Sequence, residues 1–118
     1  MKVLRVLPLL LLLAACAGEP YAGVGPLQIT PQVAAGYARY LKELHPLAFA
    51  VSEDGAYYDY IHCPYSLCAG GEARQARQRC EMQSRGLPCR VYALGRLVVW
   101  DGPVTVRSIP DKVFRAKT

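Results

Sequence analysis

The chain has 118 residues, 53% of them hydrophobic, so it can bury the core of one small domain but not of two. Lys and Arg outnumber Asp and Glu by 14 to 9, and this surplus is spread along the sequence. Nucleic-acid-binding proteins concentrate their basic residues on one face, so no nucleic-acid partner is predicted.

The first residues have the layout of a secretory leader. Lys2 and Arg5 are followed by an apolar run over residues 6–13 that is too short to cross a bilayer as a helix. The run ends in a segment that resembles the lipobox of bacterial lipoproteins, Leu13-Ala14-Ala15-Cys16. The resemblance implies that residues 1–15 are removed as a lipoprotein signal peptide and that Cys16 carries a diacylglyceryl group. The alternative is an ordinary leader cleaved near Ala15 or Ala17.

The expected location follows from the same resemblance. In enteric lipoproteins an aspartate after the lipidated cysteine retains the protein at the inner membrane, and this chain has Ala17 instead. We therefore expect a lipid-anchored protein of the bacterial cell envelope, at the outer membrane and facing the periplasm. Its acyl chains, such as palmitate, would be its only attachment to the membrane, because no second apolar run long enough to span a membrane follows.

The cysteine count agrees with a lipid on Cys16. Of the five cysteines, removing Cys16 leaves an even set in the later part of the chain: Cys63, Cys68, Cys80 and Cys89. In an oxidising compartment these four should pair. Three pairings are possible, and we expect Cys63–Cys68 and Cys80–Cys89. A helix that ends soon after Cys80 and a chain reversal at Gly86 would bring Cys89 back beside Cys80.

Elements in chain order begin with a segment rich in glycine and proline, residues 16–29, which we predict to be a lipidated flexible tether. Thr30-Pro31 then favours the start of an amphipathic helix that ends at His45. Its apolar stripe is spaced four, four and three residues apart: Val33, Tyr37, Leu41 and Leu44, widened by Ala34 and Ala38.

A hairpin, a second helix and a second hairpin follow. Residues 47–52 and 56–61 predict strands joined by a turn at Glu53-Asp54-Gly55. A helix is expected over residues 72–85, ending at Gly86 and packing closely through small residues, Ala73, Ala76 and Cys80. Residues 89–94 and 97–100 predict the second hairpin, with Gly95-Arg96 as its two-residue turn.

This order predicts an α+β fold stapled by disulfides. We expect a small antiparallel sheet of two hairpins with both helices on one face. The single domain would span residues 30–105, with a basic C-terminal tail over residues 106–118.

Part of the domain resembles small exported domains of proteobacteria that have no known activity. The resemblance lies in Phe49-Ala50-Val51-Ser52, Asp54-Gly55, Cys63, Cys80, Cys89-Arg90-Val91-Tyr92-Ala93 and Val98-Val99-Trp100. It implies export and a non-enzymatic role.

Residues for catalysis or metal binding are few, and we predict no enzyme activity, metal or cofactor. The serines lack a nucleophile-elbow context, and His45 and His62 are expected at the ends of elements. A zinc site on His62 and the four later cysteines is the rival to disulfides, but the gaps of four, eleven and eight residues are not those of zinc ligands. A redox role lacks a Cys-x-x-Cys motif.

Tyrosine is the one conspicuous residue type, with eight in the chain. Five aromatic residues gather around the first hairpin as a candidate binding site: Tyr57, Tyr58, Tyr60, His62 and Tyr65. Tyrosine suits contacts with a protein or a glycan. It is also a common strand residue, which favours the alternative that these rings pack at the edge of the sheet. We therefore expect a non-catalytic structural or binding module with an envelope protein or glycan as partner. The alternative is a periplasmic inhibitor of a lytic enzyme or protease that inserts the Cys63–Cys68 loop.

Overall fold

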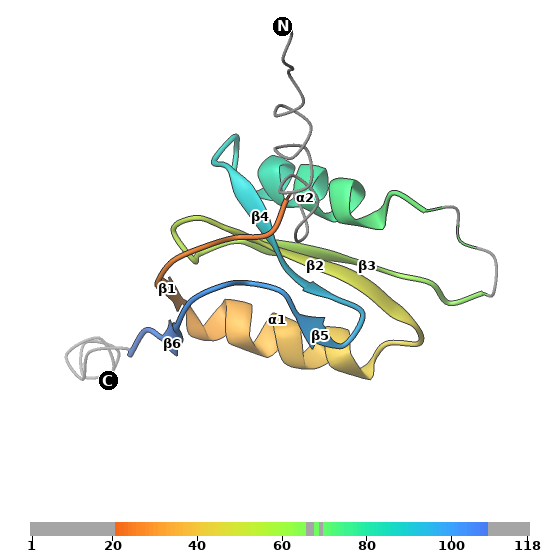
Figure 1. Ribbon diagram of the computed structural model, residues 1–118, viewed down its shortest axis with the longest axis horizontal. Helices are drawn as coiled ribbons and strands as arrows, with labels where there is room; N and C mark the ends of the chain where they lie inside the picture. The colour runs from red at the N-terminus through yellow and green to blue at the C-terminus, as the bar shows by residue number, and fades with distance from the viewer. Residues whose placement is uncertain (1–20, 66–67, 69, 109–118) are drawn as a thin grey trace, which may run out of the picture.

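The computed structural model describes residues 21–65, 68 and 70–108, which form an α+β domain (Figure 1). The leader, Cys16 and residues 109–118 of the predicted tail lie outside the described residues. The predicted α+β fold class and the predicted order of helix, hairpin, helix and hairpin are confirmed, and the structure adds two short strands, one before the first helix and one after the second hairpin. The elements are β1 (Leu27–Ile29), α1 (Pro31–Lys42), β2 (Pro46–Ser52), β3 (Tyr58–His62), α2 (Glu72–Gln83), β4 (Cys89–Leu94), β5 (Leu97–Val98) and β6 (Val104–Val106).

Four strands form an antiparallel sheet in the order β3-β2-β4-β5, so the two predicted hairpins lie side by side. Strand β2 is central: its Phe49 is paired with Tyr60 of β3 on one side and with Ala93 of β4 on the other. The turn between β4 and β5 is at Gly95, which has a φ of 58° as the first residue of a type II′ turn requires. The outer edges of the sheet are therefore β3 and β5.

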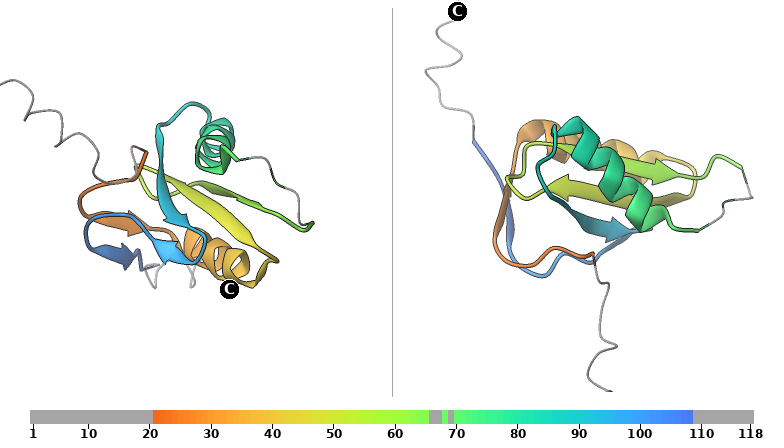
Figure 2. Two further views of the ribbon diagram at one scale, coloured as in Figure 1. Left: turned by 45° about the vertical axis from the view of Figure 1, so that its right-hand side comes forward. Right: turned by 90° about the horizontal axis from the view of Figure 1, so that it is seen from above.

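The helices lie on opposite faces of this sheet, and the prediction that both lie on one face is wrong (Figures 1 and 2). Side chains alternate along a strand, so β2 presents Phe49 and Val51 to α1 and presents Ala48 and Ala50 to α2. A strand that is apolar at consecutive positions needs cover on both sides.

The face covered by α1 is aromatic. Rings of Tyr37 and Tyr40 pack on Phe49 with centroids 5.1 and 5.4 Å apart. Gly36 allows a strand residue to approach the helix, because a Cβ there would lie 2.2 Å from the ring of Tyr58. The helix ends at Lys42, three residues earlier than predicted. Leu44 is 65% exposed, so it is not part of the buried stripe.

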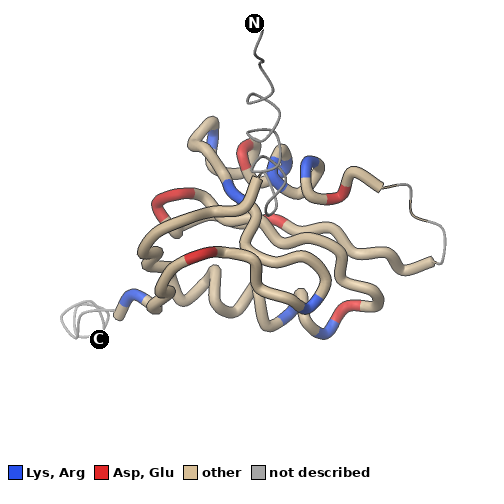
Figure 3. Tube along the Cα trace, viewed as in Figure 1, with Lys and Arg blue, Asp and Glu red and all other residues tan. Residues whose placement is uncertain are grey.

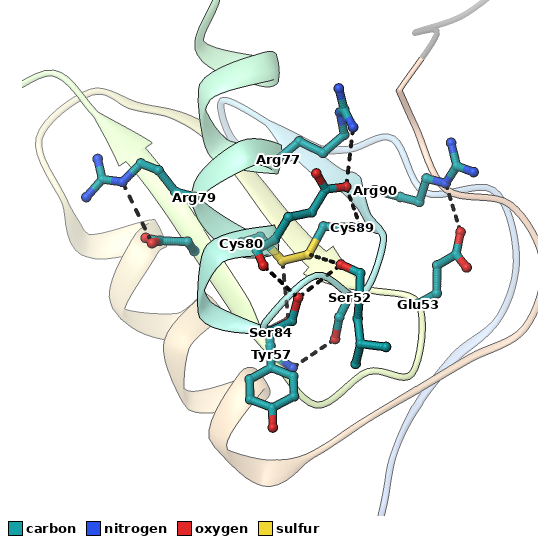
Figure 4. The surroundings of a disulfide bond; sticks show 12 residues. Ser52, Glu53, Tyr57, Arg77, Arg79, Cys80, Ser84, Cys89 and Arg90 are labelled. Atoms are coloured by element: carbon teal, nitrogen blue, oxygen red, sulfur yellow. Dashed lines mark hydrogen bonds and ion pairs between the residues drawn. A yellow bond between two sulfur atoms is a disulfide. The ribbon is translucent and has the colours of Figure 1, made fainter.

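The face covered by α2 is built from small residues, as predicted. Ala76 and Cys80 of the helix are fully buried, whereas Ala73 is only partly buried. The disulfide Cys80–Cys89 joins α2 to β4, and Cys63–Cys68 closes the loop after β3, which confirms both predicted pairings. Figure 4 shows this disulfide between Cys80 and Cys89. The Cys89 backbone N–H donates a hydrogen bond to the carboxylate of Glu81 at 3.1 Å.

Residues 21–29 are part of the domain, so the predicted flexible tether is wrong for that segment. It runs beside residues 99–107, and β1 pairs in parallel with β6. The Trp100 indole N–H donates to the Gly25 carbonyl at 2.8 Å, and its ring lies so close to Gly23 that a Cβ there would be 2.0 Å away. Leu27 and Ile29 are buried in the core. The domain boundary therefore lies at or before Tyr21, and β6 extends the domain to Val106.

Candidate binding surface along the edge of β3

Strand β3 leaves one edge of the sheet without a neighbouring strand among the described residues. The hairpin begins with a hydrogen bond from the Ser52 N–H to the Tyr57 carbonyl, 2.9 Å long. Hydrogen-bonded pairs alternate along an antiparallel ladder, so the backbone groups of Tyr58, Tyr60 and His62 point away from β2. An outward row of this kind can pair with an added strand.

A depression of about 520 Å³ follows this edge. Its lining comes from three elements: Glu43 at the end of α1, Tyr58, Asp59, Tyr60, Ile61 and His62 of β3, and Arg79 and Gln83 of α2. The two helices cover opposite faces of the sheet, so the depression has one wall from each helix and β3 between them.

The wall on the α1 side is a chain of polar contacts around Glu43. The Tyr60 hydroxyl donates to Glu43 Oε2 at 2.6 Å, and Nε2 of His62 lies 3.8 Å from Glu43 Oε1. Burial, with the hydrogen bond to Glu43, raises the pKa of Tyr60 to about 12, so the phenol keeps its proton at neutral pH. Beside them the Tyr58 hydroxyl accepts a hydrogen bond from the Arg39 guanidinium.

The wall on the α2 side is held by Asp59. One of its oxygens lies 3.7 Å from Nε of Arg79, and the other accepts the Tyr60 backbone N–H at 2.8 Å. Asp59 thereby satisfies one outward backbone donor of β3. The depression contains one carboxylate and one neighbouring arginine on each wall, so it does not favour a strongly charged ligand of either sign.

The five predicted site residues divide into two groups. Tyr58, Tyr60 and His62 share one face of β3 and line the depression. Tyr58 and Tyr60 also stack on Phe49, with centroids 5.3 and 6.0 Å apart. Both interpretations of the rings, contact surface and packing, therefore apply to the same side chains.

The remaining two tyrosines lie outside the depression. Tyr57, just before β3, is 42% exposed, and Tyr65 is 80% exposed on the Cys63–Cys68 loop. Ser66 and Leu67 of that loop lie outside the described residues. Tyr65 borders a separate hollow of about 300 Å³ together with His45 and Leu47.

The sequence reasoning missed five residues that line the depression, Glu43, Asp59, Ile61, Arg79 and Gln83. It also missed Arg39, which donates to the Tyr58 hydroxyl. Arg39 and Glu43 lie four residues apart on either side of buried Tyr40, so the correct buried stripe of α1 would have placed both beside β3. The pairing of Arg79 with Asp59 depends on the orientation of α2 relative to the strands of the sheet. No local sequence pattern predicts that orientation.

Neither a metal site nor a membrane span is found in the described part of the chain. Its cysteines are all disulfide-bonded, and no group of three His, Cys, Asp or Glu residues there could hold a metal ion. Neither α1 nor α2 is long and apolar enough to cross a membrane. Comparison with models of known protein families, with curated proteins and with solved structures found no match to the chain.

Proposed function

We propose that the protein is a lipid-anchored lipoprotein of the bacterial envelope, held at the outer membrane and facing the periplasm. The observation that carries this proposal is the pairing of the cysteines. Cys63, Cys68, Cys80 and Cys89 are used in two disulfides, which leaves Cys16, at the end of a lipobox-like sequence, as the odd one. An unpaired cysteine in an exported protein calls for an explanation, and lipidation of Cys16 explains it.

The domain on this anchor acts as a non-catalytic binding module that takes an extended segment of another envelope protein along β3. The outward backbone groups of Tyr58 and His62 and the outward carbonyl of Tyr60 offer main-chain hydrogen bonds, and the depression offers polar side chains on both walls. A protein segment fits this edge better than a glycan, because a glycan cannot continue the ladder of a sheet.

A photo-reactive cross-linker tests where the partner lies. Gln83 is exposed and lines the depression, whereas Leu97 is exposed on β5 at the opposite edge of the sheet. In intact envelopes, a cross-linking side chain at position 83 should give one dominant protein adduct and the same side chain at position 97 should not. Equal adducts from both positions would contradict binding at β3.

Two variants of one residue test whether the backbone is recognised. His62→Pro removes an outward N–H from an edge strand, where proline is tolerated, and His62→Ala removes only the side chain. The adduct from position 83 should be lost in His62→Pro and retained in His62→Ala, with both variants folded by thermal unfolding. Loss in both variants would mean that the imidazole is recognised and that strand addition is wrong.

A second candidate function is inhibition of a lytic enzyme or protease. Tyr65 favours it, because the ring is 80% exposed on a loop that the Cys63–Cys68 disulfide closes. A constrained loop loses little conformational entropy when it enters an active site. This function predicts an adduct from position 65 rather than position 83, together with slower cleavage by a purified muramidase or protease.

A further inference from the structure

The outer surface of α2 is positively charged and carries no acidic residue along its outermost line. The helix buries Ala76 and Cys80, so the residues on its opposite side face away from the domain. Those residues are all exposed: Arg74, Gln78 and Met82, with Arg85 just beyond the helix end. Figure 3 shows basic positions along this helix.

The two arginines on this line differ from their basic neighbours. Arg77, Arg79 and Arg90 each have a carboxylate within ion-pair distance, at 3.4, 3.7 and 3.0 Å. Among the described residues, no carboxylate forms an ion pair with Arg74 or Arg85. Met82, between them, is 79% exposed. Unpaired arginines beside an exposed apolar side chain suit the boundary between lipid headgroups and acyl chains.

The chain toward Cys16 leaves the domain beside this surface. The Arg77 guanidinium lies 4.3 Å from the ring centroid of Tyr21, the first described residue. From Cys16 to Tyr21 is five residues, which span at most about 18 Å in any conformation. That reach is shorter than the width of a domain of this size, about 30 Å. A lipid on Cys16 would thus keep α2 nearer the membrane than the α1 side.

We infer that the outer line of α2 docks on the anionic phospholipid headgroups of the leaflet that holds the anchor. This inference rests on the lipid anchor proposed above. Attraction between exposed charges falls off over about 8 Å at physiological ionic strength, so the short link to Cys16 is what brings the arginines into range. Docking through α2 leaves the edge of β3 and the α1 side turned toward the periplasm.

Arginine modification on vesicles tests the orientation. The full processed protein is reconstituted in phosphatidylcholine vesicles, with or without about 30% phosphatidylglycerol, and phenylglyoxal adducts are located by mass spectrometry. We expect Arg74 and Arg85 to react roughly threefold more slowly on the anionic vesicles. Arg39 and Arg96, on the α1 side, serve as internal controls whose rates should not change. Protection should vanish in about 0.5 M NaCl, where the screening length is only a few ångströms.

A variant separates charge recognition from proximity. In Arg74→Gln/Arg85→Gln, Arg77 of the same helix should react at the same rate on both vesicle types. In Lys42→Gln, on α1, the slower reaction of Arg74 and Arg85 on the anionic vesicles should persist. Equal rates on both vesicle types, or protection of Arg39 and Arg96 instead, would overturn the inference while the acylated Cys16 peptide is still detected. Absence of that acylated peptide, with protein that does not float with the vesicles, would instead overturn the proposed anchor.

Discussion

The guanidinium of Arg77 lies over the ring of Tyr21, 4.3 Å from its centroid, and so joins α2 to the first described residue. The backbone of Tyr21 also accepts a hydrogen bond from the Val91 N–H at 2.8 Å. The segment that approaches the proposed anchor is therefore fixed to the domain rather than loosely attached.

Gly23→Ala should destabilise the domain by about 1–3 kcal/mol, because the added methyl group would overlap the Trp100 ring. Urea unfolding measures the change. Val24→Ala is the matched control: the neighbouring side chain is 75% exposed, so its removal should change stability by less than about 0.5 kcal/mol. Equal, small effects of both substitutions would mean that this segment is a tether after all.

Tyr58→Ala should cost about 2–3 kcal/mol, since the ring stacks on Phe49 and fills the space that Gly36 leaves on α1. Tyr57→Ala, one residue earlier, removes a more exposed ring and should cost well under 1 kcal/mol. Thermal or urea unfolding distinguishes them. If the two adjacent substitutions cost the same, Tyr58 is not a packing residue.

The two disulfides should differ in their contribution to stability. Replacing both Cys80 and Cys89 by Ala opens a loop of about ten residues, worth ~2.7 kcal/mol in the chain-entropy model, and also leaves the small-residue core under-filled. Replacing both Cys63 and Cys68 opens a shorter loop, worth ~2 kcal/mol. Urea unfolding should therefore rank the first variant as the less stable, and the reverse order would contradict the burial of Cys80–Cys89.

Stability should fall between pH 10 and about pH 12, with Tyr60 as one cause. The folded state holds the Tyr60 proton more tightly than the unfolded chain, whose pKa is the ordinary 10.0. The stabilisation is complete below pH 10 and is lost as the pH rises through the folded value. Tyr60→Phe should reduce this loss without abolishing it, because burial also raises the pKa of Tyr37, Tyr40 and Tyr92. An unchanged pH dependence in Tyr60→Phe would contradict the burial of the Tyr60 hydroxyl and its hydrogen bond to Glu43.

Local patterns in the sequence were sufficient to predict the individual elements. Thr30-Pro31 starts α1 through a side-chain cap to the Val33 N–H, and Gly95 sets the turn between β4 and β5. The disulfide between Cys80 and Cys89 could also be predicted, because Cys80 is in α2, the chain reverses at Gly86, and Cys89 begins the strand β4 that follows. Each of these features depends on residues that are close in sequence.

The features that were missed depend on contacts between distant segments. Ala48 and Ala50 alternate with larger apolar residues in the sequence, and the structure shows that they form a second buried face for α2. Residues 21–29 looked flexible because their two buried apolar residues, Leu27 and Ile29, pair with β6 far along the chain. The sequence alone leaves open whether Tyr58 packs in the core or serves as a contact surface, because nothing near it in sequence shows that Gly36 makes room for its ring. The second buried face of β2, the place of residues 21–29 in the domain and the packing of Tyr58 all depend on contacts between segments that are far apart in the sequence.

The most direct test of the lipid anchor is the mass of the mature N-terminal peptide, measured together with the fractionation of Cys16→Ser. We predict that the wild-type protein begins at Cys16, carries diacylglyceryl and acyl groups and stays in the membrane fraction, since each buried methylene contributes about 0.8 kcal/mol. Cys16→Ser should accumulate as unprocessed precursor or appear in the soluble fraction. A processed Cys16→Ser protein that remains membrane-bound, or a wild-type N-terminus without lipid, would contradict the account.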